Sequence, residues 1–340
     1  MTEHLLYQHS QGVMEVTLNA PATLNALTAS MAAELLHQLR LWQTNDEVAC
    51  IVIRGSGDKA FCAGGDIQQL YQHMAAQNYT ACADFFATEY KLDYALHSYS
   101  KPVIAWVDGI VMGGGMGIMQ GCSHRVVTER VSMAMPETHI GLIPDVGSGD
   151  FLNQREDRLA WLLPLTGGQI QLAEVMYLGL ADYYVGSARY DQLLGLLQQG
   201  QDVTQCLQKI QQPAAASWLD NYQQSLAAAL AESAQATLQT LRTIEDAAMR
   251  ELCRRMDYAS PLAQNAAWRH LLSCQAFAAG SRRREFALQQ EYNLVMELCR
   301  HGEFAEGIRA LIIDKDKAPQ WSAQREFWFT ENMRLELEEI

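Results

Sequence analysis

The chain has 340 residues and a formal net charge of -14 at pH 7, from 39 acidic and 25 basic residues. Because this balance opposes the attraction to phosphate on which nucleic-acid binding depends, we expect no nucleic-acid partner. Hydrophobic residues make up 49% of the chain, but no run approaches the roughly 20 apolar residues that cross a bilayer, so we expect no membrane partner.

The first residues, MTEHLLYQHSQGVMEVTL, lack the basic segment, apolar segment and cleavage site of a secretion signal, so we expect a cytoplasmic protein. The eight cysteines form no CxxC pair and fit reduced, buried thiols better than a disulfide framework. The nine histidines show no ligand spacing such as HExxH. We therefore expect no metal.

The first half of the chain alternates strand and helix patterns. Apolar side chains alternate, or run together between turn residues, in three predicted strands: residues 12–19, 48–55 and 101–109. Apolar residues recur at intervals of three and four in three predicted helices: residues 28–42, 66–74 and 79–99. This order predicts an α/β core with some parallel pairing, in which ligands bind at the strand ends.

Beyond about residue 186 the pattern becomes helical. Apolar residues keep a helical period over 221–256, and two more helical stretches are predicted over 262–279 and 283–301. We therefore divide the chain into a core over 1–190 and a helical region over 191–340 that packs on this core.

Three turns are rich in glycine: FCAGGD (61–66), DGIVMGGGMG (108–117) and PDVGSGD (144–150). None is a P-loop or a GxGxxG fingerprint. In the first two, a strand runs into glycines and then into a helical pattern, so free backbone N–H groups would point at a bound group. Two such donors aimed at one point form an oxyanion hole. The alternative is that these glycines only permit tight turns.

The sequence gives little support for a cysteine or serine nucleophile. Cys62 has no accompanying histidine and is expected to be a buried structural thiol. Because no GxSxG elbow surrounds Ser56 or Ser148, a serine hydrolase is disfavoured. We expect His139 to serve packing rather than proton transfer. What stands out is two carboxylates, Glu137 and Asp145, within the loop-like stretch MPETHIGLIPDVGSGD.

Longer stretches resemble a known family. KAFCAGGDI, KPVIAWVDGIVMGGGMGI and MPETHIGLIPDVGSGDFL are similar, in order and spacing, to motifs of the crotonase (enoyl-CoA hydratase/isomerase) superfamily. More narrowly, PETHIGLIPDVG, GLADYYV and EFAEGIRALIIDKDKAPQW resemble the 3-hydroxyisobutyryl-CoA hydrolases. The last motif is the most specific, because general crotonases lack it. The resemblance implies a core of repeated ββα units, an enlarged C-terminal helical region, and an acyl-CoA substrate with no separate cofactor.

The resemblance also implies roles for particular residues. The backbone N–H groups of Gly65 and Gly114 correspond to the oxyanion hole. Glu137 and Asp145 correspond to the catalytic acids, with Glu137 as nucleophile or general base. Glu89 in the preceding helix corresponds to a further acid, which would contact the substrate together with Gly114, Glu137 and Asp145.

One position separates hydrolases from hydratases. The hydratase pattern has a second catalytic glutamate where this chain has Gly117. Without it, the pair of carboxylates that positions water for addition to a double bond is lost. The resemblance therefore favours hydrolysis of 3-hydroxyisobutyryl-CoA in valine breakdown. The alternatives are an enoyl-CoA hydratase or isomerase, and an acyl-CoA-binding protein without turnover.

The chain departs from the family at several points. PDVGSGDFLNQRED replaces the usual PDVGGGYFLPRL, so Ser148 and Asp150 alter the turn beside the catalytic acid, and the added charge is expected to change substrate choice. Candidates for binding the CoA phosphates are Lys59, Lys101 and Lys315. Crotonases often form trimers or hexamers, so a homo-oligomer is one expectation. The other is that the enlarged C-terminal region covers its own core.

Overall fold

The computed structural model describes residues 4–230, 233–322 and 334–337. The strands are β1 Leu5–Ser10, β2 Val13–Leu18, β3 Cys50–Gly55, β4 Ala60–Cys62, β5 Val103–Val107, β6 Ile110–Met112, β7 His124–Val127, β8 Ser132–Ala134 and β9 Tyr183–Tyr184. The α-helices are α1 Ala29–Gln43, α2 Ile67–Ala75, α3 Tyr79–Ser98, α4 Gly114–Gly121, α5 Ser148–Phe151, α6 Leu162–Thr166, α7 Leu172–Tyr177, α8 Tyr190–Leu197, α9 Val203–Ile210, α10 Gln223–Ala229, α11 Ala234–Leu241, α12 Ala247–Tyr258, α13 Pro261–Cys274, α14 Ser281–His301 and α15 Glu303–Ile308. Shorter 3₁₀ turns span Pro21–Thr23, Glu137–Ile140, Leu159–Trp161, Ser187–Arg189 and Trp218–Tyr222, and a π-helical turn spans Arg309–Ile313.

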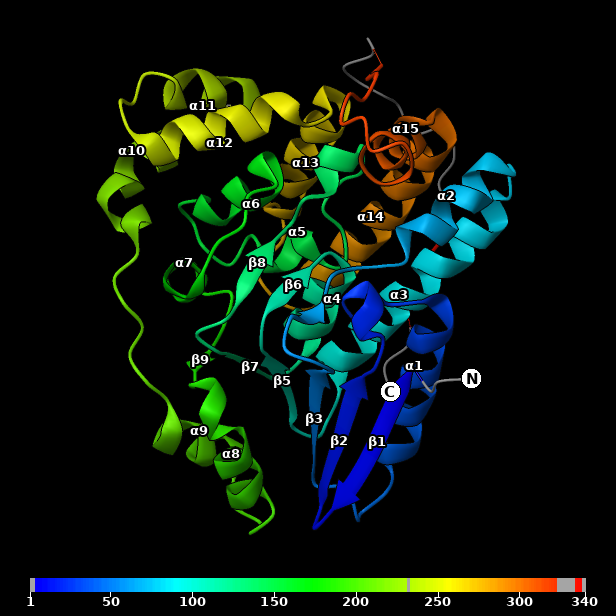
Figure 1. The fold of residues 1–340 in the computed structure, drawn as a ribbon, viewed down its shortest axis with the longest axis vertical. Helices are drawn as coiled ribbons and strands as arrows, with labels where there is room; N and C mark the ends of the chain where they lie inside the picture. The colour runs from blue at the N-terminus through cyan, green and yellow to red at the C-terminus, as the bar shows by residue number, and fades with distance from the viewer. Residues whose placement is uncertain (1–3, 231–232, 323–333, 338–340) are drawn as a thin grey trace.

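The strands form two sheets. The larger has the order β1-β2-β3-β5-β7-β9 and the smaller β4-β6-β8 (Figure 1). All pairs are parallel except β1 with β2. The chain alternates between the sheets in three successive pairs of strands, β3-β4, β5-β6 and β7-β8. In each pair the first strand lies in the larger sheet and the second in the smaller one. Helices after these pairs return the chain for the next parallel strand, which confirms the predicted ββα repeats.

The predicted strands and helices of the first half are confirmed as β2, β3, β5, α1, α2 and α3. Side-chain caps fix the starts of these helices: Thr28, Asp66 and Asn78 accept hydrogen bonds from backbone N–H groups in the first turns of α1, α2 and α3. The smaller sheet was not predicted, because strands of three residues are too short to show a periodic pattern.

Helices cover both faces of the larger sheet. On one face, Val16, Ile53 and Ala105 belong to a continuous hydrophobic core that extends through α1 and α3 to α13 and α14. On the other face, Leu193 of α8 and Leu207 of α9 belong to the cluster that contains Val52, Ile104 and Trp106. Residues just beyond position 190 therefore cover a sheet of the core, and the division of the chain at that position stays a prediction. The end of the predicted helical region, residues 323–333 and 338–340, lies outside the described residues.

The helical period over 221–256 is divided among three helices, α10, α11 and α12. Ser233 starts α11, because its side chain accepts a hydrogen bond from the Ala236 N–H group and so begins a new helix. Residues 231–232 lie outside the described ranges. The two helices predicted next are confirmed as α13 and α14. No helix in the described ranges is long and apolar enough to span a bilayer.

The late family motif packs backbone against backbone on the loop that carries Glu137. A β-carbon placed on Gly307 of α15 would lie 2.2 Å from the carbonyl carbon of Ile140. Any larger residue at position 307 would therefore push α15 away from this loop.

We expect Gly307→Ala to lower the free energy of unfolding by about 1–3 kcal/mol, since the added methyl group overpacks a contact with backbone. Gly195→Ala in α8 is the matched control. Nothing lies within 4 Å of a β-carbon there, and alanine is favoured over glycine in a helix by about 1 kcal/mol. The change in the free energy of unfolding, measured by urea denaturation, should have opposite signs for the two variants. Equal stability of Gly307→Ala and the parent would contradict the close contact.

Candidate active site

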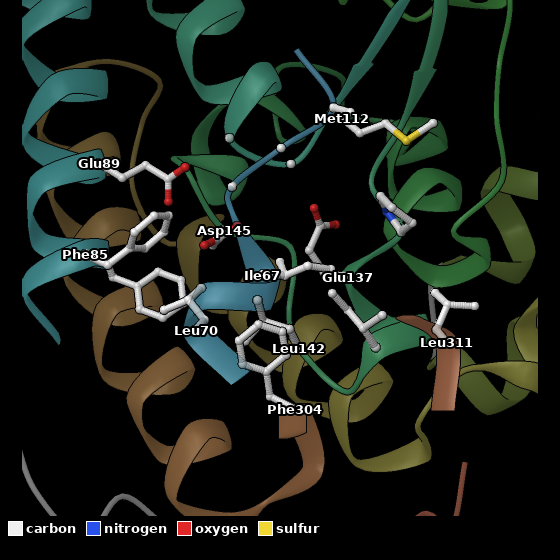
Figure 2. Close-up of a pocket in the computed structure, with 18 residues that line it drawn as sticks. Ile67, Leu70, Phe85, Glu89, Met112, Glu137, Leu142, Asp145, Phe304 and Leu311 are labelled. Carbon is white, nitrogen blue, oxygen red and sulfur yellow. The ribbon is translucent and has the colours of Figure 1, made fainter. Parts of the chain in front are cut away.

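A cavity of about 150 Å³ lies where the two glycine turns, α3, the 136–145 loop and α15 meet. Figure 2 shows the carboxyl groups of Glu89, Asp145 and Glu137 above a group of apolar side chains. These apolar lining residues include Ile67, Leu70, Phe85, Phe86, Ile140, Leu142, Phe304 and Leu311. Phe304 and Leu311 come from the late family motif, which therefore supplies one wall.

The glycine turns place two backbone N–H groups at this cavity. Strand β4 leads to Gly64, with a φ of +108°, and strand β6 leads to Gly113, with a φ of +49°. A β-carbon on Gly114 would lie 3.5 Å from the backbone nitrogen of Gly65, so the two turns approach closely. Within the described ranges, neither Gly65 nor Gly114 donates its N–H group to another protein group. The structure thus brings the predicted donors together, and their role as an oxyanion hole stays a prediction.

Glu89 reaches the same place from α3. Its side chain is buried, and its Oε1 atom has no hydrogen-bond partner among the described residues. A β-carbon on Gly114 would lie 2.1 Å from this oxygen, so the carboxyl group is directly at the start of α4. Burial and, after it, the charge of Asp145 raise the pKa of Glu89 well above its ordinary value.

Glu137 and Asp145 come from the loop in which the sequence predicts them. Glu137 opens a 3₁₀ turn and is buried, and its Oε2 atom has no partner in the described part of the chain. Burial, followed by the charge of Asp145, raises the pKa of Glu137 well above its ordinary value. Asp145 accepts a hydrogen bond of 2.7 Å from the hydroxyl group of Tyr90. Burial raises the pKa of Asp145 to about 7, although the Tyr90 hydrogen bond works in the opposite direction.

Sequence reasoning missed Tyr90 and Asp93. Tyr90 directly follows Glu89, and its position on the buried side of α3 was the only available signal. Asp93 is fully buried one helical turn after Glu89, and within the described ranges neither of its carboxyl oxygens has a hydrogen-bond partner. A β-carbon on Gly117 would lie 2.6 Å from both of these oxygens. Asp93 therefore fills the space beside Gly117.

The structure supports the structural interpretation of Cys62 and His139. Cys62 is fully buried, and burial raises the pKa of its thiol, which disfavours the thiolate. The Nε2 atom of His139 lies 3.2 Å from the Arg255 carbonyl oxygen, and the His139 ring packs edge-to-face on Tyr258. Neither residue lines the cavity.

The charge of Asp150 does not reach the acyl cavity, contrary to expectation. Its Oδ1 atom lies 2.7 Å from Nε of Arg283, and its Oδ2 atom lies 3.2 Å from Arg284. Helix α5 turns this side chain toward α14, so the extra charge is neutralised there. Ser148 is also directed toward α14, with its hydroxyl group 3.2 Å from Glu291.

The candidate phosphate-binding lysines lie in different surroundings. The ammonium group of Lys101 donates to the carbonyl groups of Trp42 and Asn45 at the C-terminal end of α1, at 2.7 and 2.6 Å. Lys59 lines a separate hollow together with Pro21 and Asn25. Lys315 is exposed after the late helices. Because two donors of Lys101 are already used, Lys59 and Lys315 are the better candidates.

We expect Asp145→Asn to stabilise the protein increasingly as the pH rises. The folded-state pKa of about 7 lies above that of an unfolded aspartate, so the stability contributed by the protonated group is lost as the pH rises through 7. Asparagine has no such dependence. The increase in the free energy of unfolding over the parent, measured with urea, should be near zero at pH 4 and on the order of 1–3 kcal/mol at pH 8. Asp46→Asn, at an exposed position, is the control, and an equal pH response of both variants would contradict a raised pKa.

Known proteins resemble this chain in sequence and in fold. A 3-hydroxyisobutyryl-CoA hydrolase of Rattus norvegicus, named as mitochondrial, is 34% identical over 90% of this chain and 81% of its own length. A probable 3-hydroxyisobutyryl-CoA hydrolase of Arabidopsis thaliana is 31% identical over 94% of this chain and 87% of its own. The crystal structure of an enoyl-CoA hydratase from Rhodobacter sphaeroides, 32% identical, matches with a TM-score of 0.87 over 95% of this chain and 93% of that one.

A second solved structure, of a carnitinyl-CoA dehydratase from Mycobacterium thermoresistibile, is 29% identical and also has a TM-score of 0.87, over 94% of this chain and 92% of that one. The sequence profile of the enoyl-CoA hydratase/isomerase family matches residues 13–333. The match covers both glycine turns, the loop with the two acids and the late motif. The chain therefore belongs to the enoyl-CoA hydratase/isomerase, or crotonase, family.

Proposed function

We propose that the protein hydrolyses 3-hydroxyisobutyryl-CoA, a short branched 3-hydroxyacyl-CoA thioester, to 3-hydroxyisobutyrate and coenzyme A. The observation that carries the proposal is the meeting of three buried carboxyl groups and two unpaired backbone N–H groups at one small cavity. Relatives that cover most of the chain and are named 3-hydroxyisobutyryl-CoA hydrolases support the same reaction.

In this proposal the thioester carbonyl oxygen lies between the N–H groups of Gly65 and Gly114. Negative charge develops on this oxygen when the carbonyl carbon is attacked, and two preorganised donors in a buried site stabilise it. Glu137 either attacks the carbon itself or removes a proton from the attacking water. If water attacks, the carbon–sulfur bond breaks, the acid forms directly, and the CoA sulfur takes up the proton that Glu137 removed. If Glu137 attacks, the same bond breaks, the sulfur takes a proton from a neighbouring protonated acid, and water then cleaves the mixed anhydride, which restores Glu137 and that acid.

Glu89 and Asp145 complete the site in this proposal. Because burial raises their pKa values, both can hold a proton near neutral pH, so both can donate a hydrogen bond. The hydroxyl group of the acyl chain is a suitable partner for either acid. The apolar wall of Leu142, Phe304 and Leu311 would receive the branched methyl group, and a cavity of about 150 Å³ suits a short acyl chain.

Hydration of an enoyl-CoA is the second candidate, because solved relatives carry hydratase and dehydratase titles. The surroundings of Gly117 argue against it. A side chain at that position would collide with Asp93, so the second hydratase carboxylate is absent and its space is filled. A binding protein without turnover is the third candidate.

The wider setting is also a proposal. A role in valine breakdown follows from the substrate named for the relatives. A cytoplasmic location stays a prediction, since several of these relatives are named as mitochondrial. Assembly into a homo-oligomer stays a prediction as well.

We expect Glu137→Gln to reduce thiol release from 3-hydroxyisobutyryl-CoA by about 100-fold or more, because an amide can neither attack the carbonyl carbon nor accept the proton of water. The fold should persist, since the two side chains have nearly the same shape. Glu251→Gln, which changes an exposed glutamate, should keep the parental rate. Near-parental turnover by Glu137→Gln would refute the role of Glu137.

A panel of short acyl-CoA thioesters separates the three candidate functions. Thiol release should be fastest with 3-hydroxyisobutyryl-CoA, and crotonyl-CoA should keep its enoyl absorbance. Loss of that absorbance without thiol release would favour a hydratase. Saturable CoA binding without either reaction would favour a binding protein.

A further inference from the structure

A buried pair of opposite charges lies behind the loop that carries Asp145. Glu291 of α14 and His270 of α13 both have fully buried side chains, and the His270 Nε2 atom lies 2.9 Å from Glu291 Oε1. Neither residue lines the acyl cavity. The proposed reaction does not use them, and the family motifs of the sequence do not include them.

Glu291 holds the turn that follows Asp145. Its Oε2 atom accepts a hydrogen bond of 2.7 Å from the Gly147 N–H group, and its Oε1 atom accepts one of 3.0 Å from the Gly149 N–H group. The Oγ atom of Ser148, which has one hydrogen to donate, lies 2.9 Å from the Pro144 carbonyl oxygen and 3.2 Å from Glu291 Oε1. Acceptance at both oxygens is typical of an ionised carboxylate.

His270 supplies the matching positive charge. Burial by itself would lower the pKa of this imidazole, but the nearby Cys274 sulfur and the Glu291 carboxylate outweigh burial and raise the pKa to about 10. This pKa favours the imidazolium form of the ring at neutral pH. A buried ion pair of this kind has little net effect on stability while both partners are present, but removing one partner leaves an uncompensated charge.

Further contacts fasten the same turn to the C-terminal helices. Asp150 pairs with Arg283 and Arg284 of α14. The amide group of Asn153 donates to the carbonyl groups of Gly149 and Leu271, each at 2.9 Å. The two departures from the family pattern, Ser148 and Asp150, are thus both contacts with α14.

Several ionisable groups act on Asp145 from the surrounding elements. They are Glu89, Tyr90 and Asp93 of α3, Glu137 of the neighbouring loop, His270 of α13, and Glu291 and Cys299 of α14, whereas Cys274 of α13 acts on His270. His270 is the cation among them. Its charge favours ionised Asp145, whereas the charge of Glu291 disfavours it.

We propose that His270 and Glu291 are a pair of positioning residues that hold the Asp145 turn in place and balance the charge on Asp145 from behind the cavity. The inference deepens the proposed hydrolase function and rests on it for the catalytic meaning of Asp145. It assigns to α13 and α14 a part in setting the protonation state of an active-site acid that neither helix carries.

The two members of the pair must then shift Asp145 in opposite directions. His270→Gln keeps a donor for Glu291 but removes the positive charge, so the pKa of Asp145 should rise by about one pH unit. Glu291→Gln removes the negative charge but also a group that keeps His270 charged, so the pKa of Asp145 should fall, by less than it rises in His270→Gln. The double variant has neither charge and should return toward the parent, as a double-mutant cycle requires for coupled groups.

Carbon-13 NMR of protein labelled at aspartate carboxyl carbons measures this without turnover. Asp145→Asn identifies the Asp145 signal by its loss. The pH profile of thiol release is recorded for the same four proteins and should move with the NMR titration. If no acyl-CoA releases thiol but the titrations shift as described, the proposed function fails while the charge balance stands.

A merely structural role predicts another result. Both single variants would then lose activity and thermal stability without opposite shifts in the Asp145 titration, and the double variant would be no better than either. Shifts in one direction, or none, would overturn the proposal. If a single variant fails to fold, the test is made on the parent protein. Nitrogen-15 NMR of its histidines must then show His270 as an imidazolium at pH 8. A neutral His270 ring at that pH would also overturn the proposal.

Discussion

The site depends on the burial of several carboxyl groups around one small cavity. Glu89, Glu137 and Asp145 all lie away from water, and each has a pKa raised by burial before any other cause. Charges of the same sign in one buried site disfavour each other's ionisation. Such a site is suited to both donating and accepting hydrogen bonds at a thioester.

The two sheets bring this cavity into existence. In each ββα repeat one strand belongs to each sheet, so the ends of β4 and β6 lie next to each other in the smaller sheet. The glycine turns that follow these strands consequently meet, and the N–H groups of Gly65 and Gly114 reach the same cavity. Helix α3 packs on α4 and supplies Glu89. Asp93, on the next turn of α3, fills the space beside Gly117.

The C-terminal helices contribute to the site in two ways. At the cavity itself, α15 and the turn after it provide Phe304 and Leu311 as part of the wall. Outside the cavity, Glu291 of α14 accepts hydrogen bonds from the turn after Asp145, and His270 of α13 contacts Glu291. The C-terminal helices therefore both line the cavity and support the loop that carries Asp145.

The local elements and the acids could be predicted from the order of the amino acids. Periodicity located β2, β3, β5 and the first three helices, because these are long enough for a repeat of two or 3.6 residues to appear. The spacing of Glu137 and Asp145 between prolines and glycines indicated a loop. Resemblance to the family added Gly65, Gly114 and Glu89, and these residues do lie at one cavity.

Interactions between residues far apart in the chain became visible only in the folded protein. Tyr90 and Asp145 are 55 positions apart, and Gly147 and Glu291 are 144 apart, and no local pattern records such contacts. The direction of Asp150 was misjudged for the same reason, since its partners are on a helix more than a hundred residues later. A sequence shows which side chains can carry charge, but burial and pairing set the pKa of each, and both arise only when the chain has folded.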